Sequence, residues 1–449
     1  MHFRIMRADR GYRSDYLWLP LAKLRNLAAI KNSLTFPQDQ KAPIHAYHMT
    51  KNHIIVPREY IPYDQWETLD FVIEDRTPES FPRVDAYSGT KLRDAVQTTA
   101  YSSLLEHGSG ILSLSCGKGK TVVSLKAWVK TGVPALVVVH TKELRNQWVE
   151  RIIEHTSLTE DEVGTYQGKV EDWEKPICVA MIQTLASRVQ SGDLPEGFED
   201  HFGVVIYDEV HHLGAPYFNT TAALGKGLRW GLSATPDRDD GLDALYQYHL
   251  GGIVYQNLDH DIIPDTYFIR TGTHIPPNVW PELRDRTGEV SIPKLLTWLG
   301  EDVKRNEKII ETLDAALEKN RKVLALSSRV DHLNALHSVY PDAGKIHGKV
   351  SDKNREGVLY NHDLVFATTS LAKEGLDRKD LDTVALLLPI TKEGMFRQIL
   401  GRIQRESDGK NQPVMIVFED NNVPICVNMC RKLRHILTNL NYPFYLTDE

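Results

Sequence analysis

A lysine and a threonine follow two closely spaced glycines after an apolar run, and this order of residue types suits phosphate chemistry. Glycines let backbone N–H groups approach phosphate oxygens, and the helix expected next directs its positive end at the same place. Lys120 is then placed to reach the β- and γ-phosphates of a nucleotide, and Thr121 to hold Mg²⁺. The residues expected to contact the nucleotide here are Cys116, Gly117, Lys118, Gly119, Lys120 and Thr121.

One position departs from the strict form of this phosphate-binding motif. The strict pattern has a glycine at position 114, where this chain has Leu114 at the end of the apolar run. A glycine-rich turn that carries Lys-Thr without binding a nucleotide is therefore the alternative for this stretch alone. The choice between the two depends on the rest of the chain.

Two adjacent acids follow a second apolar run at residues 204–207. A buried strand that ends in Asp208 and Glu209 would present both carboxylates at the carboxyl edge of a parallel sheet, where ligands bind in such folds. Asp208 would hold Mg²⁺, and Glu209 would orient and deprotonate an attacking water. The alternative is a helix start, where acids are common because of the helix dipole.

Hydroxyls and cations later in the chain would complete such a site. Ser233 and Thr235 follow a further strand-like run and can bridge the acids to a neighbouring surface. Arg402 and Arg405 are three residues apart, so both face one side if their stretch is helical. Cations across a cleft from the phosphate loop would neutralise transition-state charge, which is typically worth roughly 10³–10⁵ in rate. In isolation, these stretches also fit an ordinary turn and a basic surface helix.

The elements that must position these residues are short Val- and Ile-rich runs that alternate with helical stretches. This alternation predicts doubly wound parallel sheets. The predicted fold class is α/β, with two tandem parallel-sheet domains and a small α+β domain in front of them. The expected domains cover residues 1–88, 89–260 and 261–449. Strands are expected at 111–114, 135–139, 177–180, 204–207 and 228–232, and then at 322–327, 343–346, 363–367, 383–388 and 414–418.

The first part of the chain differs from the rest in charge. Residues 1–60 contain ten Lys/Arg against four Asp/Glu, with aromatic residues interleaved. We expect a helix over 17–30 and short strands at 54–56 and 69–73. Basic side chains with aromatics suit phosphate contacts and base stacking, so contact with DNA is the functional interpretation. An ordinary solvated face over a small core is the alternative.

Composition limits the classes of protein to which this chain can belong. The formal net charge is −7, so any nucleic-acid surface has to be local. The four cysteines are too few and too scattered for a disulfide framework, and buried thiols fit them better than a metal site. We expect neither a signal peptide nor a membrane span. These features fit a reducing cytoplasm, that of the host if the protein is viral.

Four stretches in this order resemble the motifs of superfamily-two helicases. They are Gly117-Lys118-Gly119-Lys120-Thr121, the DExH box Asp208-Glu209-Val210-His211, Ser233-Ala234-Thr235, and the Gln398 to Arg405 stretch. The sequence that continues from Thr235 to Gly241 is similar to the XPB/UvsW branch of that superfamily. The basic front domain and the compact length most resemble phage branch-migration helicases, which act in DNA replication, recombination and repair. The resemblance implies RecA-like folds for both parallel-sheet domains, and ATP with Mg²⁺ as cofactors.

The same resemblance assigns further residues. It implies adenine contact by Gln97, nucleotide contact by Gly375 and Asp377, and catalytic roles for Lys120, Asp208, Glu209, Arg402 and Arg405. It implies that His211, Ser233, Thr235 and Gln398 couple hydrolysis to movement. The implied contacts with the nucleic-acid backbone are His140, Thr141, Gln183, Thr184, Ser328, Arg329, Thr368 and Thr369.

The expected function is an ATP-dependent DNA helicase or translocase that unwinds or branch-migrates forked and junction DNA. Its partner would be branched DNA, held by backbone contacts without sequence specificity, together with other replication or recombination proteins. An RNA helicase and the motor part of a restriction complex remain alternatives within the enzyme class. A remodelling, annealing or scaffolding factor, with DNA-stimulated or vestigial ATPase activity, is the alternative outside it.

Overall fold

The computed structural model divides into two compact units, Met1–Leu258 and Asp259–Glu449. It describes residues 7–38, 41–115, 117–234, 241–259, 262–348, 352–374, 378–390, 393–404, 407 and 409–447. Five residues with predicted roles lie outside the described residues: Cys116, Thr235, Gly375, Asp377 and Arg405.

The first unit is built on an eight-stranded sheet with the order β11-β10-β12-β9-β13-β14-β8-β15. Every pair of neighbours is parallel except β10 and β11. The strands are β8 (Gly110–Leu114), β9 (Ala135–Val139), β10 (Val163–Gln167), β11 (Val170–Asp172), β12 (Ile177–Met181), β13 (Val204–Asp208), β14 (Leu228–Ser233) and β15 (Ile253–Asn257).

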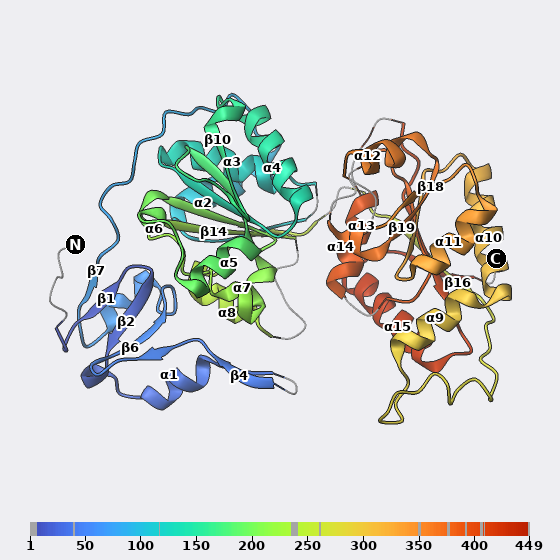
Figure 1. Ribbon diagram of the computed structural model, residues 1–449, viewed down its shortest axis with the longest axis horizontal. Helices are drawn as coiled ribbons and strands as arrows, with labels where there is room; N and C mark the ends of the chain where they lie inside the picture. Colours follow the sequence, from blue (N-terminus) through green and yellow to red (C-terminus); the bar gives the residue numbers. More distant parts are fainter. Residues whose placement is uncertain are drawn as a thin grey trace. The chain divides into compact units, whose positions relative to one another are not determined.

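Helices cover both faces of this sheet (Figure 1). One face packs on α2 (Ala95–His107), α3 (Lys120–Thr131) and α4 (Lys142–His155). The other face packs on α5 (Ile182–Ser191), α6 (Phe198–His201), the 3₁₀ turn η4 (Val210–Gly214), α7 (Pro216–Asn219) and α8 (Asp243–Leu250). A sheet enclosed in this way needs strands that are apolar on both sides, which explains the continuous apolar runs in the sequence.

The second unit repeats this architecture with a seven-stranded sheet of order β18-β19-β17-β20-β21-β16-β22, parallel throughout its recorded pairs. Its strands are β16 (Asp265–Arg270), β17 (Val323–Ser327), β18 (Gly344–Ile346), β19 (Leu364–Thr368), β20 (Thr383–Leu386), β21 (Val414–Glu419) and β22 (Phe444–Thr447). Its helices are α9 (Ile292–Glu301), α10 (Val303–Glu318), α11 (Val330–Val339), α12 (Asp352–Asn361), α13 (Thr369–Glu374), α14 (Glu393–Ile403) and α15 (Pro424–Asn439).

The N-terminal part of the first unit has a small mixed sheet with the order β5-β6-β2-β1-β7. Its strands are β1 (Gly11–Arg13), β2 (Tyr16–Pro20), β5 (His48–Met49), β6 (His53–Pro57) and β7 (Ile73–Asp75). A two-stranded sheet of β3 (Thr35–Gln38) and β4 (Lys41–His45), the helix α1 (Leu27–Ser33) and the 3₁₀ turns η1 (Leu21–Lys23) and η2 (Tyr63–Thr68) complete it. We call this part the N-terminal domain.

The helix predicted over 17–30 is wrong over most of its length. Tyr16–Pro20 is a strand that pairs with β1 and β6, and the α-helix covers only Leu27–Ser33. Leu17 and Leu19 are completely buried, while Trp18 between them is only partly buried. Burial of every second residue is the period of a strand, and long-range pairing therefore overrode the local helix pattern.

The described residues include neither a membrane-spanning helix nor a clustered set of metal-ligating side chains. Among those residues, no helix combines the length and apolar character needed to cross a membrane. The same ranges contain no group of three or more His, Cys, Asp or Glu side chains arranged to hold a metal ion. Cys178, Cys426 and Cys430 are buried free thiols.

Candidate active site

Three neighbouring parallel strands bring the predicted catalytic residues to one edge of the first large sheet. Strand β14 lies between β13 and β8, and the register pairs Asp208 with Leu232 and Ser233 with Ser113. All three strands therefore end at the same edge. The phosphate loop follows β8, the two acids end β13, and Ser233 ends β14. This edge is where open α/β sheets bind their ligands.

The phosphate loop needs its glycines for conformation and for space. Gly117 and Gly119 have φ angles of 81° and 83°, in the left-handed region that favours glycine. A Cβ atom on Gly119 would lie 2.3 Å from the side-chain nitrogen of Gln97. Lys120 begins α3, and its ammonium donates a hydrogen bond to the carbonyl of Leu114 at 2.9 Å. The loop and its lysine thus form the cradle expected for a nucleotide phosphate.

Gln97 supports this loop directly. Its side-chain nitrogen donates to the carbonyl of Lys118 at 3.0 Å, and its side-chain oxygen accepts from the backbone N–H of Arg93 at 2.8 Å. The side chain is 5% exposed. Each end of the amide makes one hydrogen bond within the protein and keeps the capacity for another, so the adenine contact remains a prediction.

The carboxylate of Asp208 is held from two sides. Trp148 on α4 donates its indole N–H to Oδ2 at 2.8 Å, and the backbone N–H of Glu209 donates to Oδ1 at 3.0 Å. Burial and the neighbouring Glu209 charge raise the pKa of Asp208 to about 6, although the Trp148 hydrogen bond and Lys120 act in the opposite direction. A cation bound at this carboxylate would favour its ionised form.

Glu209 has a strained backbone and a side chain that lies close to His211. Its φ of 49° is a left-handed conformation that is uncommon for a residue other than glycine, and such strain clusters at functional sites. Its buried Oε2 atom makes no hydrogen bond with any residue that the structure describes, and it lies 3.4 Å from Nδ1 of His211. The same His211 nitrogen is 3.4 Å from Oγ of Ser233. The structure therefore connects Glu209 to Ser233 through His211.

The raised pKa of Asp208 predicts how the stability of the metal-free protein depends on pH. Because the folded pKa of about 6 exceeds the usual 3.8, protonation of Asp208 stabilises the fold fully at low pH, and this stabilisation is lost as pH rises through about 6. Asp208→Asn removes the charge and keeps the shape. We expect it to raise Tm at pH 8 by roughly 2–6 °C over wild type, with a smaller gap at pH 5.

Thermal unfolding with EDTA at pH values from 5 to 8 measures this difference. Asp193→Asn is the matched control, because Asp193 is exposed on the same unit and lies at none of the predicted site positions. A gap between Asp208→Asn and wild type that did not change with pH would contradict the assignment of the raised pKa.

The predicted nucleic-acid contacts of the first unit meet at the ends of β9 and β12, which are parallel neighbours. The side chain of Gln183 donates to the carbonyl of His140 at 2.8 Å, and Thr141 caps α4 by accepting from the N–H of Leu144. Thr184 accepts from the N–H of Gly168 at 3.1 Å. These residues lie together, and their hydroxyl groups also have structural hydrogen bonds.

The corresponding residues of the second unit meet at one edge of its sheet. Ser327 pairs in register with Thr368, so Ser328 and the start of α13 at Thr369 lie at neighbouring strand ends. Arg329 donates to Oγ1 of Thr297 at 3.1 Å and to the carbonyl of Pro293 at 2.8 Å. Packing against α9 therefore orients this guanidinium.

The helix α14 carries two more predicted site residues, Gln398 and Arg402, which are four residues apart and so share a face. Gln398 is 5% exposed, and among the described parts of the chain its buried side-chain oxygen has no hydrogen-bond partner. Arg402 is partly buried in the last turn of the helix. Arg405 follows that helix, outside the residues described.

Sequence reasoning missed two contributors to the site. The sequence patterns assigned no role to Trp148, yet its indole N–H donates a hydrogen bond to Asp208. His212 lies between His140 and His211, with ring centroids 3.8 and 4.5 Å away. No spacing in the sequence marks either contact, because each joins side chains from separate elements. The His-His pair after the two acids was the only available signal.

Two protein-family models match this chain, one in each large unit. The family model described as "Type III restriction enzyme, res subunit" matches residues 63–238, and that described as "Helicase conserved C-terminal domain" matches residues 304–407. The protein named DNA 3'-5' helicase XPB from Mycobacterium tuberculosis is 38% identical over 156 residues, which are 34% of this chain and 28% of that protein. The chain belongs to the superfamily-two helicases, and its similarity to XPB extends over part of both chains. It is thus an ATP-dependent nucleic-acid helicase or ATPase.

Two further similarities span more of this helicase. A protein of Acanthamoeba polyphaga mimivirus, named as an ATP-dependent RNA helicase, is 28% identical over 382 residues, 82% of this chain and 71% of that protein. The solved structure of yeast Dbp5 bound to RNA and ADP BeF3 covers 79% of this chain and 90% of its own, with a TM-score of 0.57 and 13% identity. The likeness to Dbp5 shows the fold, which is two RecA-like domains.

Proposed function

We propose that this helicase is a DNA translocase that unwinds or branch-migrates forked and junction DNA during replication, recombination or repair. The observation that carries the proposal is the assembly of the phosphate loop, the two acids and Ser233 at one sheet edge, in a chain similar to a DNA helicase named XPB. The basic, aromatic-bearing start of the chain adds support for a nucleic-acid partner.

In this proposal the nucleoside triphosphate ATP lies over the phosphate loop. Lys120 neutralises the β- and γ-phosphates, and Glu209 takes a proton from the attacking water. Thr121 and Asp208 would hold Mg²⁺, which would supply charge neutralisation at the phosphates. Hydroxyl and carboxylate oxygens fit that ion, which usually takes one or two protein ligands and completes its shell with phosphates and water. The buried Oε2 of Glu209 has no hydrogen-bond partner among the residues described, which supports its role as a base.

Arg402 and Arg405 are proposed to supply the remaining positive charge from the second RecA-like domain. Closing of the two domains around the nucleotide would bring these guanidinium groups to the γ-phosphate, and hydrolysis would release them. His211, Ser233, Thr235 and Gln398 would then convert closure into movement. The contacts from Glu209 through His211 to Ser233 support such a link on the first domain.

Movement along DNA requires that both domains hold one strand. Backbone contacts of this kind read no sequence, because hydroxyls and backbone N–H groups reach only phosphates and sugars. The residues proposed for this contact meet at strand ends in each unit. They are His140, Thr141, Gln183 and Thr184 in the first unit, and Ser328, Arg329, Thr368 and Thr369 in the second.

The N-terminal domain is the proposed holder of the duplex or junction. Lys23, Arg25 and Lys51 are exposed on it, and the ring of Tyr63 is 71% exposed beside Trp66. Exposed cations and a neighbouring aromatic pair, with ring planes tilted by 49°, suit phosphate and base contacts. We also propose a reducing cytoplasm as the location and branched DNA, with replication or recombination proteins, as the partners.

An RNA substrate is the second candidate, because the mimivirus relative is named as an RNA helicase. A DNA-stimulated ATPase that remodels or anneals strands is the third. All three hypotheses predict ATP hydrolysis, so substrate preference and strand separation distinguish them. The test is a panel of forked duplexes, four-way junctions, tailed duplexes and matched RNA versions, scored for ATPase rate and strand separation.

We expect forked or four-way DNA to stimulate ATPase about tenfold or more, in line with typical coupling between two sites. Strand separation should require both ATP and Mg²⁺. Equal or greater activity on the RNA versions would favour an RNA helicase. Stimulation without strand separation or branch migration on any substrate would favour the remodelling ATPase.

A further inference from the structure

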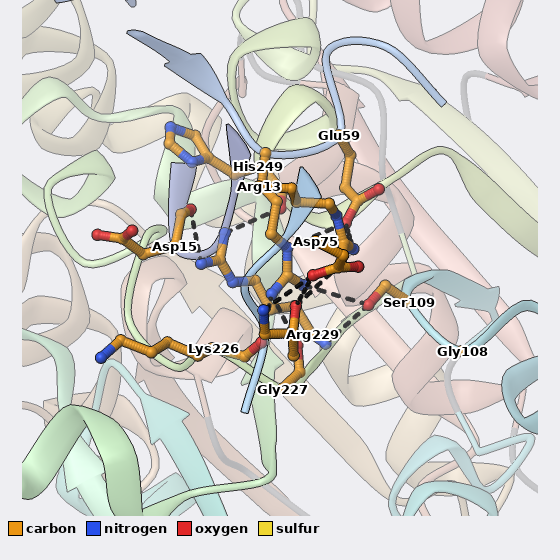
Figure 2. A network of polar contacts seen from close by, with 12 residues as sticks. Arg13, Asp15, Glu59, Asp75, Gly108, Ser109, Lys226, Gly227, Arg229 and His249 are labelled. Carbon is orange, nitrogen blue, oxygen red and sulfur yellow. Dashed lines mark hydrogen bonds and ion pairs between the residues drawn. The ribbon is translucent and has the colours of Figure 1, made fainter. Parts of the chain in front are cut away.

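The N-terminal domain is joined to the first RecA-like domain by two buried arginines, one from each side. Arg58, just after β6, donates to the carbonyls of Lys226 and Gly227 at 3.1 and 2.8 Å. Arg229, on β14, donates to the carbonyl of Asp15 at 2.9 Å. Figure 2 shows Arg229 between Asp15 and His249, with Glu59 and Arg13 close by. We call Arg58 and Arg229 the interdomain arginine pair.

Both guanidinium groups are removed from water, with residue exposures of 1% for Arg58 and 0% for Arg229. Burial lowers the pKa of Arg58 well below its usual range, and the charges of Arg229 and Arg13 lower it further. The opposing carboxylate is Glu59, 3.0 Å from Arg58 and 2.8 Å from Arg13. Buried charges of this kind add little net stability, but each backbone carbonyl they contact fixes one geometry.

The interface holds β14 and α8, the two elements on either side of residues 234–242. Strand β14 ends at Ser233, helix α8 begins at Asp243, and the Ser-Ala-Thr motif opens the stretch between them. Arg229 on β14 also donates to the carbonyl of His249 on α8 at 3.2 Å. The N–H of Glu59 donates to the carbonyl of Tyr248 on α8 at 2.8 Å. The N-terminal domain therefore contacts the strand before the segment and the helix after it.

Aromatic packing reinforces the contact with α8. The ring of Tyr248 lies 5.2 Å from that of Tyr60 and 6.5 Å from that of Phe36, both in the N-terminal domain. Tyr248 packs on the core of that domain, and Phe36 shares a cluster with Leu245 of α8. Apolar packing of α8 therefore adds to the polar contacts between the two domains.

The far end of β14 reaches the catalytic edge. Ser233 is the fourth residue after Arg229, which is roughly 13 Å along a strand. There, Oγ of Ser233 lies 3.4 Å from Nδ1 of His211, which lies 3.4 Å from Oε2 of Glu209. A displacement of β14 at Arg229 would therefore reach the proposed general base through one buried strand and one histidine.

We propose that the interdomain arginine pair transmits the DNA-bound state of the N-terminal domain to Glu209, through β14, α8 and the His211–Ser233 contact. Arg58 and Arg229 are positioning residues in this scheme, since neither reaches the catalytic edge itself. The scheme rests on the proposed function, because it requires that DNA held by the N-terminal domain stimulates ATP hydrolysis. The two states are the free and DNA-bound placements of β14 and α8.

The test compares Arg58→Gln with wild type and with Arg76→Gln, using a forked DNA duplex with single-stranded arms as probe. Arg76 is the matched control, because its contacts with Glu74 and the Tyr12 ring stay within the N-terminal domain. In Arg58→Gln we expect ATPase without DNA to change less than about twofold. DNA-stimulated kcat should fall about tenfold, with KM for ATP unchanged, since only the coupling is lost. Arg58→Lys should restore part of the stimulation.

Hydrogen exchange of wild type gives a second measurement that does not depend on how any variant folds. Adding the forked DNA without nucleotide should change exchange of the amides of residues 243–250. Either unchanged exchange there, or full stimulation of folded Arg58→Gln, would overturn the proposal. Wild-type ATPase that did not respond to DNA or RNA would overturn the proposed function and, with it, this inference.

Discussion

Lys120→Ala should lower ATP hydrolysis by roughly 10³-fold or more, with DNA affinity largely unchanged. The expected loss is large because a fixed positive charge at the phosphates stabilises charge that develops in the transition state. The Lys120 ammonium donates to the carbonyl of Leu114 at 2.9 Å, and the two glycines before it leave room for phosphate oxygens. Steady-state ATPase at saturating forked DNA measures the loss, and fluorescence anisotropy measures DNA binding.

Two other variants sharpen this result. Lys130→Ala removes an exposed lysine from the same helix and should keep wild-type turnover. Glu209→Gln should keep ATP binding but lower turnover by roughly 10²–10⁴-fold, because it removes the proposed base and preserves the side-chain shape. Normal turnover in Lys120→Ala would rule out the proposed nucleotide site.

Arg405→Ala should lower kcat by roughly 10³-fold or more while changing KM for ATP much less. A cation supplied from a second domain acts in the transition state, where the γ-phosphoryl group develops charge, and contributes little to ground-state binding. Arg402 lies in the last turn of α14 and shares a face with Gln398. Arg402→Ala, measured in parallel, shows which of the two arginines provides most of this charge.

The control for the arginine experiment is Arg431→Ala, because Arg431 is an exposed arginine on α15 of the same unit. It should hydrolyse ATP at the wild-type rate. Equal rates for wild type and Arg405→Ala would show that Arg405 is not the transition-state cation. A rise in KM with an unchanged kcat would instead indicate a role in ATP binding alone.

Sequence patterns predicted the central strands closely. The runs at 111–114, 135–139 and 204–207 differ from the observed strands by at most one residue at either end. These strands are buried on both faces, so each is a largely apolar run, and the buried Ser113 is the one polar residue within the three predicted ranges. In such strands the local sequence pattern matches the burial, so they can be predicted without information about long-range contacts.

Two edge strands were missed for the opposite reason. Residues 253–257 and 444–447 form the outer strands β15 and β22, and their side chains are only partly buried or exposed. Their composition therefore does not differ clearly from that of a loop. Leu17 was predicted to lie in a helix because the apolar pattern around it fits both a helical and a strand period. Pairing with β1 and β6 makes this segment a strand.

The residue types at the catalytic edge could be predicted from the sequence alone, because the acids directly follow one apolar run and the phosphate loop follows another. That signal placed Asp208 and Glu209 at the end of one strand and the loop that leads to Lys120 after another, and parallel pairing then brought those strand ends to one edge. The loop support from Gln97 and the indole hydrogen bond of Trp148 depended on folding, since each joins separate helices to the site.

The contact between Arg58 and the carbonyls of Lys226 and Gly227 depended even more on the fold. Sequence alone marks Arg58 as one of many basic residues in a charged segment, for which an exposed position is the ordinary expectation. Its burial is set by residues about 170 positions later in the chain. Local composition therefore determined the chemistry available to this protein, and packing between distant segments determined which charged groups reach solvent and which join its domains.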